Sequence, residues 1–262
     1  MPRPLRILIV GLSYLVFGGF GFMLAYVIMP WALRGVKGRE ERIAKAQFVM
    51  HDWTRWYFRL LERWGVARPE YPITPELLAK PGGVVVIANH PSLLDIVFIM
   101  GALPRITYVA KESWITSPLM GRMLRAAGHI GAPRGKTPAD GAIALERMMD
   151  ALRAGRALLV FPEGTRSPKH GLWSFHRGAF EAALRTGAPI LPCVLDVDPP
   201  MLRKHQPWYD VPDRIMSYRM RVLPVIEPDT FPRRGKALVE RVEAMYRREM
   251  GIAEPSEHEA AK

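Results

Sequence analysis

The chain has 262 residues, a formal net charge of +12 and one cysteine. This length suits one large domain with an appendage, and a single cysteine excludes an internal disulfide framework and fits a reducing compartment. The positive charge predicts a phosphate-bearing substrate or an acidic membrane surface as partner. Since the sequence has neither zinc-finger spacing nor a basic low-complexity tail, no nucleic-acid partner is predicted. The histidines are scattered without metal-binding spacing, so no metal site is predicted.

The N-terminal segment contains an apolar run long enough to cross a membrane. No charged residue occurs from Ile7 to Met29, and a helix of that length is about 35 Å long. More basic residues follow this run than precede it, so the positive-inside rule places the main domain on the cytoplasmic side of a bacterial-type inner (cytoplasmic) membrane. Two alternatives stay open: a cleaved signal peptide, and a re-entrant hairpin in one leaflet allowed by glycines near mid-span.

A second N-terminal helix is predicted from Arg39 to Trp64, where neither glycine nor proline occurs. Aromatic and arginine side chains alternate along it, which is typical of a helix lying at the level of lipid headgroups. The alternative is a helix packed on the main domain, with its arginines reaching into solvent. Residues 1–67 are therefore predicted to form a membrane anchor and an interfacial helix.

The rest of the chain predicts a single α/β domain. Residues 68–83 are rich in proline and predict a linker, and the polar residues 253–262 predict a disordered tail. Between them, residues 84–252 alternate strand and helix patterns, which favours a largely parallel sheet covered by helices. The predicted strands are Val84–Ala88, Ile106–Ala110, His129–Ala132, Ala157–Phe161, Ile190–Leu195 and Tyr218–Ile226; the predicted helices are Ser92–Met100, Pro118–Ala127, Pro138–Ala154, Gly178–Thr186 and Arg233–Met250.

A polar turn follows the first strand of this domain. It contains His90 and Asp95, five residues apart, at the point where a strand ends and a helix begins, which is a usual place for sites in α/β sheets. With His90 in the turn and Asp95 in the first helical turn, the two side chains can meet. The carboxylate would then hold one ring nitrogen and leave the other to accept a proton. The alternative is purely structural: Ser92 and Asp95 have the spacing of a helix capping box.

A second polar turn follows the strand that ends near Phe161. Here Glu163, Gly164, Thr165 and Arg166 stand in succession. Glycine lets a backbone approach a ligand closely, and arginine offers a planar fork to phosphate oxygens.

These two turns together resemble the glycerolphosphate and lysophospholipid acyltransferase family, over roughly residues 82–197. The resemblance implies His90 and Asp95 as catalytic residues, and Glu163, Gly164, Thr165 and Arg166 as residues that bind the acceptor phosphate. It also implies Arg134 at the phosphate, because residues 128–134 lie where the family has its second block, a short strand that ends in an arginine. Pro133 stands where the family usually has Asp or Asn, a departure that affects the acceptor pocket.

By this resemblance, the function is transfer of a fatty acyl group from a thioester to the free hydroxyl of 1-acylglycerol-3-phosphate (lysophosphatidic acid), giving phosphatidic acid. No bound cofactor is implied, because acyl-CoA or an acyl carrier protein thioester is a co-substrate. The expected partners are membrane lipids, the lysophospholipid acceptor and this donor. One alternative is the same chemistry on another lysolipid or an ornithine-type lipid, and a second is a non-catalytic protein that binds anionic lipids.

Overall fold

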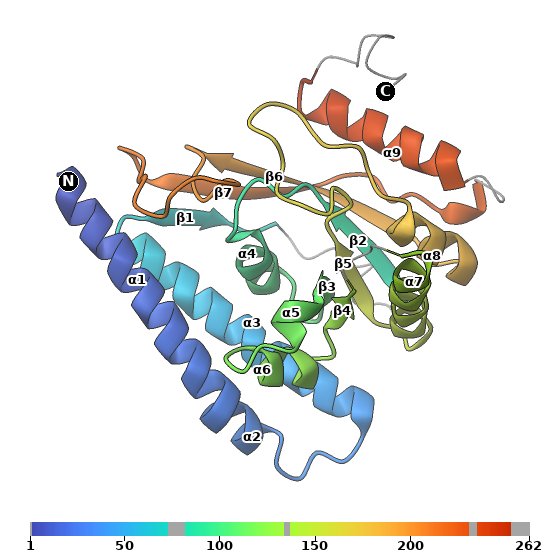
Figure 1. Cartoon of the computed structure of the whole chain (residues 1–262), viewed down its shortest axis with the longest axis horizontal. Coiled ribbons are helices and arrows are strands. Elements are labelled where there is room, and N and C mark those ends of the chain that lie inside the picture. The colour runs from blue at the N-terminus through green and yellow to red at the C-terminus, as the bar shows by residue number, and fades with distance from the viewer. Residues whose placement is uncertain (1, 73–81, 134–136, 231–234, 253–262) are drawn as a thin grey trace.

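The structure is a computed structural model that describes residues 2–72, 82–133, 137–230 and 235–252. Within these residues the chain forms a seven-stranded sheet with the order β1-β7-β6-β2-β5-β3-β4 (Figure 1). Strands β2 to β6 run parallel, whereas β7 is antiparallel to β6 and parallel to β1. The strands are β1 Ala67–Glu70, β2 Val84–Ala88, β3 Thr107–Lys111, β4 Ile130–Ala132, β5 Ala157–Val160, β6 Ile190–Asp198 and β7 Met216–Val222.

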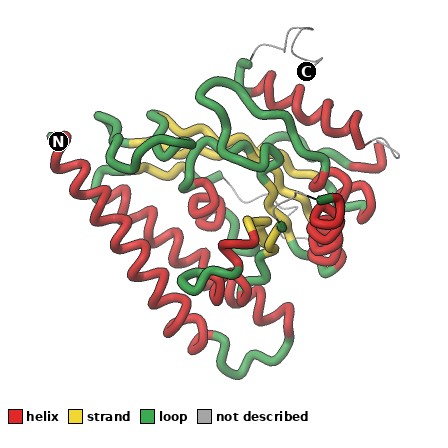
Figure 2. The backbone as a smooth tube through the Cα atoms, in the orientation of Figure 1, coloured by secondary structure: helices red, strands yellow, loops and turns green. Residues whose placement is uncertain are grey.

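Helices cover both faces of this sheet, as Figure 2 also shows. The bounds are α1 Arg3–Met23, α2 Met29–Ala32, α3 Arg39–Arg63, α4 Asp95–Ala102, α5 Glu112–Ile115, α6 Gly121–Ala126, α7 Pro138–Arg153, α8 Gly178–Thr186 and α9 Gly235–Glu249. A π-helical turn, Leu24–Ile28, joins α1 to α2, and a 3₁₀ turn covers Pro228–Thr230. The predicted fold class, a largely parallel sheet covered by helices, is confirmed.

Strand β2 explains why two layers of helices are needed. Its five residues are all buried, and successive side chains of a strand point to opposite faces. Val84, Val86 and Ala88 belong to the core under α3 and α4. Val85 and Ile87 belong to the core under α7, α8 and α9. A continuous apolar run of this kind fits only a central strand covered on both sides.

Helix α1 lies along α3 at one side of the domain (Figure 1). Aromatic side chains join the two helices, with Phe17 and Trp53 at 4.9 Å and Phe20 and Trp56 at 4.9 Å between ring centroids. Among the described residues, the helical stretch Arg3–Ala32 is the one long and apolar enough to span a membrane, judged by length and composition. Of its most apolar window, 22% is buried, and exposed apolar side chains such as Leu8 and Leu15 lie along the stretch.

Helix α3 packs on the domain, which favours the second alternative for this segment. The residues on its inner face are buried: Ile43, Ala46, Gln47, Met50, Trp53, Thr54, Tyr57, Phe58 and Leu61. Phe58 meets Phe98 of α4 with ring centroids 5.5 Å apart. The helix is therefore part of the hydrophobic core of the domain, and the boundary predicted at residue 67 does not separate two independent cores.

The linker predicted over residues 68–83 is wrong at its start. Ala67–Glu70 form β1, in which Pro69 is in register with Tyr218 of β7. Proline disfavours a central strand but is tolerated at a sheet edge, where one side of the strand needs no partner. Residues 73–81 of the predicted linker and the predicted tail, 253–262, lie outside the described residues.

Two predicted helices begin later in the structure than the sequence patterns indicated. The helix predicted from Ser92 begins at Asp95, because residues 90–94 form the polar turn. The helix predicted from Pro118 begins at Gly121, and the short helix α5 precedes it. By contrast, α8 has the predicted bounds and ends at Gly187, whose φ of 68° is left-handed, as glycine allows at a helix end.

The hydroxyl of Tyr246 in α9 lies between two central strands, β2 and β6. It accepts a hydrogen bond from the Cys193 N–H at 3.0 Å and lies 2.7 Å from the Ile87 carbonyl and 2.8 Å from the Cys193 carbonyl. These contacts satisfy backbone groups at the end of the pairing between β2 and β6, where Ala88 is in register with Cys193. The chain leaves β2 beyond this point and enters the turn that contains His90.

Candidate active site

The turn after β2 is anchored to the neighbouring strand by Asn89. Its side-chain amide donates to the Leu195 carbonyl at 2.9 Å and accepts from the Leu195 N–H at 2.7 Å. This pair of hydrogen bonds replaces a backbone ladder with β6 at the position where the strands part. His90 follows directly, so its backbone is held at the carboxyl edge of the parallel strands.

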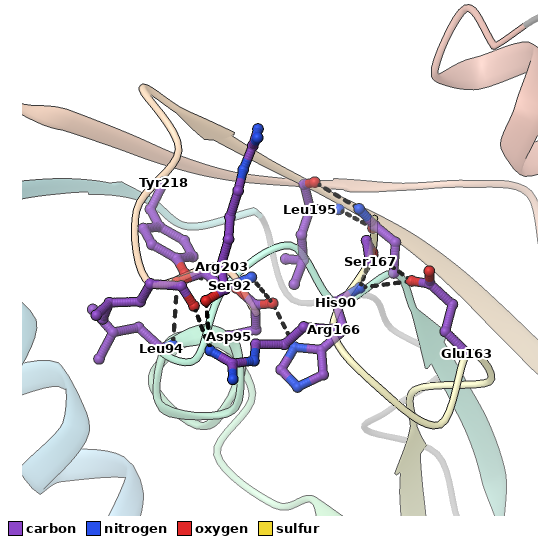
Figure 3. A network of polar contacts seen from close by, with 12 residues as sticks. His90, Ser92, Leu94, Asp95, Glu163, Arg166, Ser167, Leu195, Arg203 and Tyr218 are labelled. Atoms are coloured by element: carbon purple, nitrogen blue, oxygen red, sulfur yellow. Dashed lines mark hydrogen bonds and ion pairs between the residues drawn. The ribbon is translucent and has the colours of Figure 1, made fainter. Parts of the chain in front are cut away.

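The structure brings His90 and Asp95 into contact. His90 Nδ1 lies 2.7 Å from Asp95 Oδ2, and the Asp95 side chain is completely buried (Figure 3). Because Nδ1 faces a carboxylate, we assign its proton to this nitrogen, which leaves Nε2 as a hydrogen-bond acceptor. The His90 ring stacks on Phe161 at 4.2 Å and stays 14% exposed, so the ring is oriented yet accessible.

Part of the capping-box alternative is also present. Asp95 Oδ2 accepts a hydrogen bond from the Ser92 N–H at 2.8 Å, and the Ser92 hydroxyl accepts one from the Leu94 N–H at 3.3 Å. The carboxylate thus stabilises the start of α4 and contacts the imidazole at the same time. The capping interpretation of Ser92 and Asp95 and the catalytic interpretation of His90 and Asp95 therefore do not exclude each other.

Tyr218 of β7 also reaches the carboxylate and was missed in the sequence. Its hydroxyl donates to Asp95 Oδ1 at 2.7 Å (Figure 3). Burial raises the pKa of Tyr218 well above its usual value, and the Asp95 charge raises it further. The hydroxyl therefore keeps its proton and remains a donor. No local spacing could indicate this contact, because the two residues are 123 positions apart.

Glu163 points inward and links the two polar turns. Its carboxylate accepts hydrogen bonds from the His90 N–H at 3.1 Å, the Ser167 hydroxyl at 2.5 Å and the Trp173 N–H at 3.0 Å. Burial raises the pKa of Glu163, and these hydrogen bonds oppose that rise. The Glu163 carboxylate, which was predicted to bind substrate, thus accepts hydrogen bonds from the protein itself. The bond from the His90 N–H fixes the position of the His90 backbone.

Gly164 allows the second polar turn to close against a neighbouring loop. Its φ is +65°, a left-handed conformation that glycine adopts at little cost. A Cβ atom at this position would lie 2.9 Å from Cδ2 of His176. The glycine is exposed and the neighbouring Thr165 is half-buried, so both lie near the surface of the turn.

Arg166 reaches across to the loop between β6 and β7. Its Nη1 donates to the carbonyls of Leu202 at 2.8 Å and Arg203 at 3.0 Å (Figure 3). The same Leu202 carbonyl accepts from the Leu93 N–H at 3.2 Å. Within the described residues both side-chain hydrogen bonds of Arg166 come from Nη1, which leaves the other N–H groups of the fork available to an anion.

Arg134, the remaining predicted site residue, lies outside the described residues. In the part of the chain that the structure describes, no group of three or more His, Cys, Asp or Glu side chains could hold a metal ion.

Comparisons with known proteins relate this chain to acyltransferases. The acyltransferase family model matches residues 73–196. A 1-acyl-sn-glycerol-3-phosphate acyltransferase of Cocos nucifera is 38% identical over 116 residues, which are 42% of this chain and 36% of that protein. The Escherichia coli protein of the same name is 36% identical over 117 residues, 43% of this chain and 47% of its own length. A lyso-ornithine lipid O-acyltransferase of Pseudomonas aeruginosa is 33% identical over 143 residues, 54% of this chain and 52% of that protein.

The chain thus spans about a third to a half of the curated relatives that it matches. The fold has a longer match in a solved structure, the 1-acyl-sn-glycerophosphate acyltransferase PlsC from Thermotoga maritima. That structure aligns with a TM-score of 0.68 and 22% identity over 97% of this chain and 100% of the other. Residues 73–196 therefore match the acyltransferase family model, and the chain shares its fold with the solved PlsC structure.

Proposed function

We propose that this chain is a membrane-associated O-acyltransferase that moves a fatty acyl group from a thioester to the free hydroxyl of 1-acylglycerol-3-phosphate. The observation that carries the proposal is the 2.7 Å contact between His90 Nδ1 and Asp95 Oδ2. It leaves Nε2 of a partly exposed ring free to act as a general base. Relatives named for this reaction support the choice of acceptor.

The reaction needs no covalent enzyme intermediate, because a thioester is already activated. His90 Nε2 takes the proton of the acceptor hydroxyl while that oxygen attacks the thioester carbonyl carbon. The tetrahedral adduct collapses, the carbon–sulfur bond breaks, and the imidazolium proton passes to the leaving thiolate. The products are an ester and a free thiol, and His90 returns to its neutral form. Asp95 orients the ring and stabilises the transient imidazolium.

The experiment that tests this function supplies purified protein with acyl-CoA, or with an acylated carrier protein, and vesicles containing lysophosphatidic acid. Mass spectrometry of the lipids should detect phosphatidic acid with at least one of the two donors. The protein should also restore growth to a bacterial strain that lacks lysophosphatidic acid acylation. If neither donor gives product and growth is not restored, the proposed function is wrong.

Arg166 is proposed to bind the acceptor phosphate with the part of its fork that does not contact Leu202 and Arg203. Arg166→Lys keeps the charge but loses the planar fork, so the acceptor KM should rise about tenfold while the donor KM changes little. Steady-state kinetics with each substrate varied in turn measures this split. Arg153→Lys is the matched control, because Arg153 is an exposed α7 residue paired with Glu146 and Asp150. An equal rise in both KM values would assign Arg166 a structural role instead.

The alternative acceptor, a lyso-ornithine lipid, stays open because one relative is named for it and Pro133 departs from the usual family residue. A competition assay with equal amounts of lysophosphatidic acid and lyso-ornithine lipid separates the two. We expect phosphatidic acid to be the main product, since the phosphate is the group that the Arg166 fork recognises. If ornithine lipid were the main product, the acceptor would be lyso-ornithine lipid instead of lysophosphatidic acid, and the proposed acyl-transfer chemistry would stay the same.

The outer face of α1 is proposed to lie in the cytoplasmic membrane, with the catalytic domain on the cytoplasmic side. Leu8 and Leu15 are 67% and 74% exposed, and residues seven apart occupy the same face of a helix. Further exposed apolar side chains follow along the stretch: Phe22, Tyr26, Val27 and Trp31. A large exposed apolar surface of this kind marks an interaction site for a protein or a membrane. We propose that a lipid bilayer buries this one.

Charge on this face should therefore release the protein from membranes. The full-length chain should resist extraction by high salt and require detergent, because apolar burial is not screened by ions. Leu8→Glu/Leu15→Glu should move most of the protein into the high-salt supernatant, since each charge in the bilayer costs about 2.5–3.5 kcal/mol. Ile143→Glu/Val225→Glu, at exposed positions on other elements, should remain with the membrane. Release of the unaltered protein by salt alone would contradict the membrane assignment.

A further inference from the structure

The carboxylate of Asp95 is completely buried and receives hydrogen bonds on both oxygens. Oδ2 accepts from His90 Nδ1 and the Ser92 N–H, whereas Oδ1 accepts from the Tyr218 hydroxyl at 2.7 Å (Figure 3). Tyr218, like Asp95, has no exposed surface. A buried carboxylate oxygen without a partner carries a large desolvation cost, so the phenol is the group that satisfies Oδ1.

The Tyr218 ring is held by aromatic neighbours from two helices. Its centroid lies 5.6 Å from that of Phe58 in α3 and 5.0 Å from that of Phe98 in α4. Asp95 is the first residue of α4, so the ring packs on the same helix that carries the carboxylate. The hydroxyl is therefore fixed relative to Asp95 by packing on several sides, and removal of its oxygen alone would leave this packing in place.

The hydrogen bond has a predictable effect on the His90–Asp95 pair. A donor to a carboxylate stabilises its negative charge and lowers its affinity for a proton. The Tyr218 donor therefore weakens the tendency of the pair to hold an extra proton. A general base needs an unprotonated Nε2, so a donor on Asp95 favours the reactive form of His90.

We propose that Tyr218 is a positioning residue for acyl transfer, which orients Asp95 and sets the proton affinity of the His90–Asp95 pair through its hydroxyl. The inference rests on the proposed function of that pair. It extends the machinery from the two polar turns to β7, an element outside the segment matched by the family model, which ends at residue 196.

The other charged and titratable groups around the pair come from two elements. Glu163 accepts from the His90 backbone N–H, and Arg166 binds the carbonyls of the loop that contacts Leu93. The Ser92 side chain also hydrogen-bonds with Tyr218, and Tyr14 of α1 adds a small electrostatic effect there. Tyr218→Phe changes none of these groups, so a changed pH dependence in this variant reports the loss of the hydroxyl.

The test compares Tyr218→Phe with Tyr57→Phe. Tyr57 is a buried tyrosine of α3 whose hydroxyl donates to the Ser13 carbonyl at 3.4 Å, and it controls for loss of a buried hydroxyl. For Tyr218→Phe, kcat at neutral pH should fall about 10- to 100-fold, as expected for one charge-assisted hydrogen bond, with the acceptor KM unchanged. The acidic limb of the kcat profile should move to higher pH, so the defect shrinks in alkaline buffer. Tyr57→Phe should keep the wild-type profile.

A second readout is independent of turnover. Nuclear magnetic resonance of protein with labelled histidine, with the His90 signal assigned by its loss in His90→Ala, follows protonation of the ring without substrate. The midpoint of this titration should move to higher pH in Tyr218→Phe and stay in place in Tyr57→Phe. If the wild-type protein transfers no acyl groups, the proposed function fails, yet this titration still tests Tyr218. An unchanged titration, or a loss of rate equal at every pH, would overturn the inference.

Discussion

Replacing His90 by alanine is expected to lower kcat for acyl transfer by a factor on the order of 10²–10⁴, the usual contribution of a general base. Asp95 on Nδ1 and Phe161 on the ring face orient the imidazole, and alanine has no group that could accept the hydroxyl proton. The fold should survive, since the backbone contacts of residue 90 with Glu163 and Ser167 do not involve the ring.

The matched control for this prediction is His170→Ala, an exposed histidine on the loop after the second polar turn. Steady-state kinetics measures the rate of both variants, and circular dichroism shows whether they are folded. We expect the His170 variant to keep its rate, and both variants to keep the wild-type spectrum. A His90→Ala protein with near-normal turnover would show that proton transfer at this site is not part of the reaction.

Asp95→Asn is expected to produce the second largest loss, also about 10²–10⁴ in kcat. The amide has the shape of the carboxylate, but it has one oxygen instead of two. One of the donors that now faces the carboxylate, from His90, Ser92 or Tyr218, would meet an N–H group. The ring would lose the partner that holds the proton on Nδ1, and Nε2 would no longer be available as an acceptor.

The double variant His90→Ala/Asp95→Asn provides a sharp control. If the two residues act as one unit, the double variant should be no slower than His90→Ala alone. Thermal unfolding measures the effect of Asp95→Asn on stability separately from its effect on kcat. The buried donor left without an acceptor should lower the free energy of unfolding by about 1–3 kcal/mol. Additive losses in kcat would mean that Asp95 acts independently of His90.

Much of the fold could be predicted from the sequence because the central strands carry simple signals. Val84–Ala88 is short, apolar at every position and rich in β-branched residues, which favours a strand covered on both faces. Helix α7 begins at Pro138 after Thr137, whose hydroxyl accepts from the Asp140 N–H, a local capping pattern that a sequence shows directly. The edge strand β1 was missed, because Arg68 and Pro69 have no strand pattern and depend on β7 for their conformation.

The candidate site also contains contacts that the sequence predicts and contacts that it does not. The contact between His90 and Asp95 follows from their spacing in one turn, and the structure brings them together. The Tyr218 contact, and the contacts of Arg166 with Leu202 and Arg203, join segments far apart in the chain, so no local pattern indicates them. Glu163 illustrates a third case: a sequence identifies its position in a motif, but only packing shows that its carboxylate points inward.

The central claim is that the acyl group passes directly from thioester to acceptor, with His90 as general base. Its most direct test is the release of thiol from the acyl thioester, measured with and without acceptor. The wild-type protein should release thiol only when lysophosphatidic acid is present, with one thiol for each phosphatidic acid formed, and His90→Ala should release almost none. Intact-mass spectrometry should show no acylated protein. A burst of thiol equal to the amount of enzyme in the absence of acceptor, together with a protein heavier by one acyl group, would contradict the account.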